Sequence, residues 1–250
     1  MKTSDWQAAS GNRDRFCFAP IGVIRSCFTD KFGIPRQAGL VTAARARLEL
    51  LPELSRYEAF AGLGDFSHAW LVFVFHDCVG AGWRPTVRPP RLAGKRKVGV
   101  FASRSPYRPN PLGLSAVALD GLERQGDRLC LHLRGADLLD GTPVLDIKPY
   151  LPYADALPEA RGGYAAEPPG KDWRVELTPL ARRQLAELDP NGERELAALI
   201  EQVLRQDPRP GYMDRYPERT EFGMRLYDVE VSWRIAADHL LVTSLTRASP

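Results

Sequence analysis

The chain has 250 residues, of which 44% are hydrophobic and 26% charged, and its formal net charge is +3. This composition is typical of a folded chain with one large or two small domains, and no apolar run approaches the roughly 20 residues of a membrane span. The four cysteines and four histidines stand far apart without metal-ligand spacing, so we predict free thiols, as in a reducing cytoplasm, and no metal site.

The first 15 residues contain no apolar core of the kind found in signal peptides. We predict that they form a disordered lead-in to a first domain, residues 16–160. Many short strands, separated by turn residues, favour a barrel or a sandwich over a parallel sheet. Only Ala43–Leu54 and Glu53–Phe60 suggest short helices in this part. The predicted strands fall within Phe16–Phe28, Trp70–His76, Val98–Phe101, Leu114–Leu122, Arg128–Gly135 and Thr142–Tyr150.

The stretch Tyr150–Gly170 is rich in proline and glycine, which predicts a linker or an extended arm. After it the spacing of apolar residues becomes helical. Thr178 is a predicted N-cap, because a proline follows it at the first helical position. We predict that Asn191 caps a second helix.

The C-terminal segment has the pattern of paired strands. Met224–Ile235 and His239–Leu245 are rich in β-branched and apolar residues and are separated only by Ala236–Asp238, which predicts a hairpin. Together with the two helices, this hairpin predicts a small α+β domain over residues 171–250.

One segment resembles a dinucleotide-binding fingerprint but lacks its essential parts. The apolar run Trp70–His76 leads into Gly80 and Gly82. The fingerprint needs a third small residue and a helix that begins beside it, whereas Pro85 and a Pro/Arg-rich loop follow here. An adenosyl cofactor, if bound, is therefore expected outside a Rossmann sheet.

The positive charge is concentrated in one part of the chain. Between Cys78 and Leu119 there is no acidic residue. A segment of one sign in a nearly balanced chain indicates a phosphate-bearing partner, and a solvated loop is the alternative. Its basic residues are Arg84, Arg88, Arg91, Lys95, Arg96, Lys97, Arg104 and Arg108.

Three segments carry residues suited to binding or catalysis. In Arg104–Ser115, three prolines hold arginine side chains, whose planar forks suit carboxylates and phosphates. In Asp137–Tyr150, a turn leads into a strand with Asp146 and Lys148 on one face. The third segment, Phe32–Leu40, is a loop with an Arg-Gln pair. Each segment also has an ordinary structural interpretation, as a loop, a turn or a surface ion pair. The presence of all three segments in one chain favours a functional site.

Five stretches, in the same order, resemble the TsaA-like or TrmO tRNA (N6-threonylcarbamoyladenosine)-N6-methyltransferase family. They are PIGVIRS, FGIPRQAGL, FSHAWLVFVFH, VGVFASRSPYRPNPLGLS and GADLLDGTPVLDIKPYLPYAD. DPRPGY and LYDVEVSWRI resemble a C-terminal extension found in part of that family. The sequence departs from the family at Ala102-Ser103, where Ala-Thr is more usual, and in a longer basic loop between Cys78 and Val98.

The resemblance implies a mainly β fold, with a small, non-Rossmann β-barrel that binds S-adenosylmethionine and a small α+β domain after it. It implies a homodimer with the cofactor near the subunit interface, and methyl transfer to threonylcarbamoyladenosine beside the anticodon of tRNA. The implied cofactor contacts are Pro35, Arg36, Gln37, His68, Ala69, Arg104, Leu114, Leu139, Asp140, Gly141 and Thr142.

For catalysis we predict that Asp146 accepts the proton of the attacked nitrogen, with Lys148 steering its charge. For RNA we expect the basic loop to bind anticodon-stem phosphates, with affinity that falls steeply with salt. Tyr107 and Tyr150 are candidates for stacking on a base, or for packing in a core or interface. The predicted RNA contacts are Arg84, Arg88, Arg91, Lys95, Arg96, Lys97 and Arg108.

Two other functions remain open at this stage. The first is a methyltransferase with the same barrel that acts on a small molecule or another RNA, and the basic loop argues against the small molecule. A non-catalytic RNA-binding protein would keep the charge and lose cofactor binding.

Overall fold

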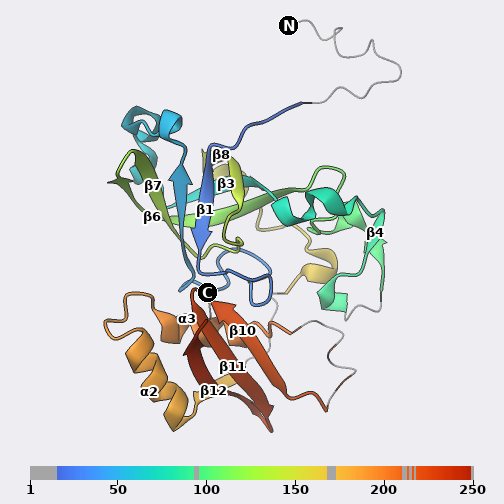
Figure 1. Ribbon diagram of the computed structural model, residues 1–250. Coiled ribbons are helices and arrows are strands. Elements are labelled where there is room, and N and C mark those ends of the chain that lie inside the picture. The colour runs from blue at the N-terminus through green and yellow to red at the C-terminus, as the bar shows by residue number, and fades with distance from the viewer. Residues whose placement is uncertain are drawn as a thin grey trace, which may run out of the picture.

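The computed structural model describes residues 16–92, 96–167, 173–209, 213, 216 and 218–248. Figure 1 shows a β-barrel above a second sheet that is flanked by two helices. The predicted lead-in, residues 1–15, lies outside the described residues. Within the described part of the chain, no helix is long and apolar enough to cross a membrane.

Six strands close into the barrel, and every neighbouring pair is antiparallel. Alternate residues point inward, as in Arg45–Leu50, where Leu48 and Leu50 are buried between half-exposed polar neighbours. The prediction of a mainly β fold is confirmed. In barrel order the strands are β1 (Gly22–Ser26), β2 (Arg45–Leu50), β7 (Arg128–Arg134), β6 (Leu112–Gln125), β3 (His68–Val74) and β8 (Pro143–Pro149).

The helix suggested over Ala43–Leu54 is wrong, because this segment contains β2. Its alternation of charged and apolar residues has period two, and pairing with β1 and β7 on either side makes the extended form favourable. Glu53–Phe60 forms two 3-10 turns rather than one helix, η1 (Pro52–Leu54) and η2 (Tyr57–Phe60). A third turn, η3 (Leu63–Asp65), precedes β3.

The basic segment forms an excursion from the barrel between β3 and β6. It contains a two-stranded hairpin, β4 (Thr86–Val87) with β5 (Val98–Gly99). After β8, the proline- and glycine-rich arm contains short helices and crosses towards the second sheet. The remaining helical turns are η4 (His76–Ala81), η5 (Pro90–Leu92), η6 (Val100–Ala102), α1 (Pro152–Asp155) and η7 (Gly163–Ala165).

The C-terminal half has a four-stranded sheet, in which β9 is parallel to β12 and the other pairs are antiparallel. The β11–β12 hairpin confirms the predicted turn, although Met224–Ile235 is divided between β10 and β11 at Tyr227, whose φ is 54°. The elements are β9 (Arg174–Leu177), α2 (Pro179–Leu188), α3 (Leu196–Arg205), β10 (Glu221–Leu226), β11 (Val229–Ala236) and β12 (His239–Arg247).

The cap of α2 is confirmed and that of α3 is corrected. The backbone N–H of Ala181 donates to Thr178 Oγ1 at 3.1 Å. Asn191 does not cap α3, because a turn intervenes and the helix begins at Leu196. There Asp189 accepts a hydrogen bond from the backbone N–H of Leu196 at 3.0 Å, so a carboxylate seven residues upstream acts as the cap.

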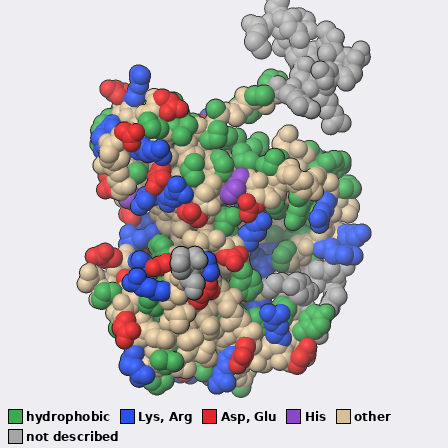
Figure 2. All heavy atoms as spheres, viewed as in Figure 1, with side chains coloured by type: hydrophobic (Ala, Val, Ile, Leu, Met, Phe, Trp, Pro, Cys, Tyr) green, Lys and Arg blue, Asp and Glu red, His purple; other side chains and the backbone are tan. Residues whose placement is uncertain are grey.

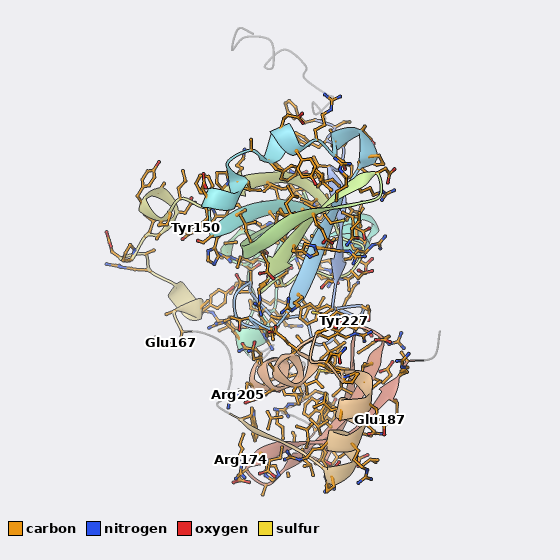
Figure 3. All side chains as sticks on the ribbon, turned by 90° about the vertical axis from the view of Figure 1, so that its left-hand side faces the viewer. Tyr150, Glu167, Arg174, Glu187, Arg205 and Tyr227 are labelled. Atoms are coloured by element: carbon orange, nitrogen blue, oxygen red, sulfur yellow. The ribbon has the colours of Figure 1, made fainter. Side chains whose placement is uncertain are left out.

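The loop between β1 and β2, residues 27–44, contributes apolar side chains to the core of the C-terminal half. Cys27, Phe28 and Val41 are buried in one apolar cluster with residues of α3 and of β10–β12. The backbone N–H of Tyr227 donates to the carbonyl of Cys27 at 2.7 Å, and Figure 3 shows Tyr227 where the two halves meet. The two halves of the molecule are therefore joined through this loop.

Candidate functional site

A cavity of about 460 Å³ opens at the end of the barrel where β3 ends and β6 begins. Four segments far apart in the sequence line it. They are the loop before β2, the end of β3 with η4, the proline-rich loop leading into β6, and the turn before β8. A concave, mostly apolar site with a few convergent polar groups is typical of a small-molecule site.

Aromatic and aliphatic side chains form the walls of this cavity. Phe73 and Phe75 meet edge to face with ring centroids 5.1 Å apart. Gly113 lies opposite Phe73 in the barrel register, and the ring occupies the space of an absent Cβ. Ile34 and Leu114 complete the apolar lining on the other segments. Such surfaces suit a planar aromatic ligand group.

Two arginines and a glutamine in the cavity wall are linked by hydrogen bonds. Arg104 donates to Gln37, and Gln37 donates to the backbone carbonyl of Arg36, so the three form a connected chain. Burial lowers the pKa of Arg36 below its ordinary value, and the negative charge of Asp207 acts in the opposite direction. A partly desolvated arginine attracts an anion strongly, and its fork fits a carboxylate.

Asp137 is the carboxylate that the sequence analysis did not select. The hydroxyl of Ser115 donates to Asp137 Oδ1 at 2.6 Å. Burial raises the pKa of the Asp137 carboxyl, while the Ser115 hydrogen bond and the charge of Arg104 act in the opposite direction. A titratable group displaced by desolvation inside a cavity is a frequent property of functional sites.

His76 and Asp77 also line the cavity and were not selected. Asp77 lies 3.3 Å from His76 Nε2 and 3.1 Å from Lys31 Nζ. Both follow directly after the buried strand β3, and this position at the carboxyl end of a strand was the signal available in the sequence.

The predicted cofactor contacts divide into two groups. Those that line the cavity are Pro35, Arg36, Gln37, Arg104, Leu114, Leu139 and Thr142. Those that do not are His68, Ala69, Asp140 and Gly141.

The four residues that do not line the cavity have other contacts. His68 and Ala69 lie at the start of β3, and the next residue, Trp70, lines the cavity. Asp140 accepts a hydrogen bond from the backbone N–H of Ser26 at 2.9 Å, and Gly141 donates to the carbonyl of Ile24 at 2.9 Å. These bonds fix the end of β1 to the turn before β8.

Asp146 and Lys148 lie on β8 and form an ion pair at 3.0 Å, with side chains 50% and 68% exposed. Neither residue lines the cavity. An exposed pair of this kind typically adds less than about 1 kcal/mol to stability. The structure therefore does not bring the two predicted catalytic residues together with the predicted cofactor contacts that line the cavity.

A second cavity, of about 1040 Å³, adjoins the first and shares Arg36, Gln37 and Arg104 with it. Figure 2 shows basic side chains around a hollow beside the barrel, at the right of the view. The predicted RNA contacts that line this second cavity are Arg84, Arg88, Arg91 and Lys97.

The other predicted RNA contacts lie elsewhere. Arg108 lines the first cavity, and its guanidinium donates to the carbonyl of Ser103 at 2.7 Å. Arg96 is exposed and lines neither cavity, and Lys95 lies outside the described residues. Tyr107 lines the second cavity, whereas Tyr150 packs against Trp70 with centroids 5.6 Å apart. In the described part of the chain, no cluster of three His, Cys, Asp or Glu side chains is arranged to hold a metal ion.

Comparison with known families shows which family this chain belongs to. Residues 23–156 match the model of the tRNA-methyltransferase O N-terminal domain, and residues 170–248 match that of the TrmO C-terminal domain. The chain belongs to the tRNA-methyltransferase O family. Both cavities lie within the part that matches the N-terminal model, apart from the short stretch Gly162–Ala165 of the arm.

Two bacterial relatives and a solved structure are similar to this chain along nearly their whole length. An Escherichia coli protein named tRNA (adenine(37)-N6)-methyltransferase is 46% identical over 220 residues, 88% of this chain and 93% of its own. A Pseudomonas aeruginosa protein with the provisional name of an S-adenosylmethionine-dependent methyltransferase is 51% identical over 224 residues, 89% of this chain and 94% of its own. The crystal structure of TrmO from Pseudomonas aeruginosa superposes with a TM-score of 0.77 at 43% identity, covering 93% of this chain and 99% of that one.

Proposed function

We propose that this chain transfers a methyl group from S-adenosylmethionine to N6 of the adenosine at position 37 of tRNA. The observation that carries the proposal is the junction of two cavities at Arg36, Gln37 and Arg104. One cavity has the size and lining for a small ligand with an aromatic group and a carboxylate, and the other is lined by cations. The names of relatives that align over most of the chain support the same activity.

The first cavity fits S-adenosylmethionine in size and chemistry. A volume of about 460 Å³ lies within the usual range of small-molecule pockets, ~300–1,000 Å³. Arg36 and Arg104 are available for the carboxylate of the methionine part, and Phe73 and Leu114 for the adenine faces. When bound, this cofactor supplies an electrophilic methyl group on a sulfonium.

The protein's main contribution is to hold the two reactants in line. Transfer forms an N–C bond as the S–C bond breaks, and the attacked nitrogen must lose its proton. Orientation of this kind is worth about 7–11 kcal/mol at best. In this proposal the two reactants meet at the shared wall of the two cavities, and the residues common to both linings, Arg104 among them, support this placement.

For the proton we propose Asp137 as the acceptor, since it is a carboxylate in the cavity wall. Its carboxylate accepts a hydrogen bond from the Ser115 hydroxyl and lies near the charge of Arg104. Asp146, with Lys148, stays the sequence-based alternative, although neither side chain lines the cavity. A partner subunit is part of the proposal, because we propose that the protein acts as a homodimer in the cytoplasm.

We propose the threonylcarbamoyl derivative of the adenosine as the acceptor. The threonylcarbamoyl group adds a carboxylate beside N6, in addition to the carboxylate of the cofactor. The two arginines at the junction, Arg36 and Arg104, are available for these two carboxylates. We also propose functional units at 1–15, 16–160 and 171–250, a lead-in, the catalytic domain and the C-terminal domain.

The test uses purified protein, labelled S-adenosylmethionine and bulk tRNA with and without the threonylcarbamoyl group. We expect label only in the modified tRNA, recovered after digestion as the N6-methylated nucleoside. Transfer to neither tRNA despite cofactor binding would favour another acceptor. Absence of cofactor binding would favour a non-catalytic RNA-binding protein.

A further inference from the structure

The second cavity has an unusual charge for a hollow of its size. Among the residues that the structure describes, six with cationic side chains line it, and none of the lining residues is an aspartate or glutamate. Like charges held together on a concave surface repel one another and require an anionic occupant. A chain of phosphates provides several charges at regular spacing, whereas a single small anion would leave most of the cations unpaired. The lining cations are Arg36, Arg84, Arg88, Arg91, Lys97 and Arg104.

An exposed aromatic side chain stands in this cationic surface. Phe101 is 75% exposed and lines the second cavity. The guanidinium of Arg108 lies 5.7 Å from the centre of its ring. An aromatic ring with one open face beside cations is the arrangement by which proteins hold single-stranded nucleic acid, with bases stacked on the ring and phosphates on the cations.

The arm that follows β8 forms the opposite wall of the cavity. Gly162, Tyr164 and Ala165 line it, and the hydroxyl of Tyr164 donates to the carbonyl of Ala102 at 3.0 Å. The turn η7 also lies against η5 of the basic excursion. Figure 1 shows this part of the arm beside the β4–β5 hairpin, although the two are far apart in the sequence. This hydrogen bond holds Tyr164 against Ala102, the residue that follows Phe101 in the sequence.

We infer that the second cavity holds the single strand on either side of the target nucleotide, and that the neighbouring base stacks on Phe101. This inference rests on the proposed function and adds the path of the strand. Phosphates pair with Arg88 and Arg91 on the excursion, and the arm at Tyr164 bounds the strand on the other side. Paired RNA is excluded from this arrangement, because its bases have no free face.

The first experiment measures stacking directly. A stem–loop RNA carries 2-aminopurine beside the target adenosine, and its fluorescence is followed as protein is added. We expect strong quenching with the native protein, none with Phe101→Ala, and quenching again with Phe101→Tyr, which keeps the ring. Tyr153→Ala is the matched control, since Tyr153 is 87% exposed and lines neither cavity.

The second measurement separates this inference from the proposed function. Phe101→Ala should weaken RNA binding by roughly 5- to 150-fold, the range for loss of one stacked base, with an unchanged dissociation constant for S-adenosylmethionine. Equal quenching and equal RNA affinity in Phe101→Ala would overturn the inference while native methyl transfer remained. A change in oligomeric state without loss of quenching would also overturn it and assign Phe101 to a contact between protomers. Failure of native protein to methylate tRNA, with quenching intact, would count against the proposed function alone.

Discussion

At the scale of single residues, the two candidate proton acceptors differ in their surroundings. Asp137 is enclosed and bonded to Ser115, whereas Asp146 is half exposed beside Lys148. We expect Asp137→Asn to lower kcat by roughly 10²- to 10⁴-fold, the usual contribution of a general base. Asp146→Asn should have little effect if Asp137 is the acceptor. The two variants are compared by single-turnover methyl transfer at saturating cofactor.

The pH dependence of the same reaction gives an independent prediction. Burial raises the pKa of the Asp137 carboxyl, so its ionised form is lost at a higher pH than that of an ordinary aspartate. We expect kcat to fall as pH decreases through this raised pKa, and the acid limb to disappear in Asp137→Asn. An acid limb that moves only in Asp146→Asn would assign the role to Asp146.

Ionisation of the Asp137 carboxyl should raise the activity but lower the free energy of unfolding. Because its pKa is raised in the folded protein, the group favours folding at low pH, and this contribution is lost as pH rises through the folded value. At neutral pH, Asp137→Asn should therefore melt at the same or a higher temperature than the native protein, although its activity falls. A lower Tm with proportionate loss of activity would indicate a structural role.

Thiol reactivity reports on occupation of the cavity. Cys78 lines the cavity, Cys17 is exposed, and burial raises the pKa of Cys27 to about 12. Because the thiolate is the reactive form, we expect a thiol reagent to label Cys17 in the native protein and Cys27 only after unfolding. S-adenosylmethionine should slow the labelling of Cys78 and leave that of Cys17 unchanged. Equal rates at Cys78 with and without cofactor would place the cofactor elsewhere.

The sequence pointed to polar residues in the loops that line the cavity, but not to the buried carboxylate of Asp137. Arg36 and Arg104 were found because rigid loops with arginines are recognisable locally. Asp137 was missed because its burial depends on the pairing of β6 with β7, which brings Ser115 towards it from another strand. His68 and Ala69, which the resemblance implied as cofactor contacts, do not line the cavity, whereas His76 does, and the sequence pattern alone does not indicate which side chains of a strand border a cavity.

At the scale of elements, the antiparallel pairing of β3 with β6 positions the aromatic wall of the first cavity. A Cβ at Gly113 would lie 2.2 Å from the ring of Phe73, which is far inside contact distance. We expect Gly113→Ala to displace that ring, to cost about 1–3 kcal/mol of unfolding free energy, and to weaken cofactor binding as well. Denaturant unfolding and calorimetric titration measure the two effects.

Gly64→Ala provides the matched control for this substitution. A Cβ at Gly64 would meet nothing within 4 Å, and the residue lies in η3 away from both cavities. Its stability and cofactor affinity should equal those of the native protein. If Gly113→Ala lost stability but bound the cofactor normally, the ring of Phe73 would not be part of the binding surface.

The sequence predicted the type of an element correctly where the pattern of apolar residues was long, and wrongly where this pattern was short. The apolar run of β3 and the alternation of β7 predicted strands that the structure contains. β2 was misjudged because a six-residue segment followed by proline fits either a short helix or a strand, and the barrel pairing decides between them. The start of α3 was misjudged because its cap comes from Asp189, outside the local sequence window.

At the scale of the whole molecule, the C-terminal half supports the loop that carries the cofactor contacts. Ile34 packs on the C-terminal core and also lines the first cavity, and Gly33 lies against Met224 and Val203. Arg36 is influenced by the charge of Asp207, which Arg209 holds at 2.6 Å. The sequence alone separated the two domains at the arm, whereas packing places residues 27–44 in the C-terminal core.

Gln202 on α3 offers a test of this support without touching either cavity. Its side-chain oxygen accepts hydrogen bonds from the backbone N–H of Ala43 at 3.0 Å and from Thr42 Oγ1 at 3.3 Å. Gln202→Ala leaves the amide of Ala43 without this acceptor, a loss of about 1–3 kcal/mol. We expect the loop to loosen and the dissociation constant for S-adenosylmethionine to rise several-fold, while Gln202→Glu, which keeps an acceptor oxygen, retains most of the affinity.

Glu187→Gln is the control, because Glu187 is exposed on α2 and lies away from the barrel (Figure 3). Cofactor affinity is measured by calorimetric titration, and amide exchange of residues 33–40 reports on the loop itself. If the C-terminal half only adds stability, Gln202→Ala will lower Tm and leave both the affinity and the exchange rates unchanged. Faster exchange together with weaker binding, and normal quenching of the stem–loop RNA at Phe101, would show that this half positions the cofactor loop independently of the RNA surface.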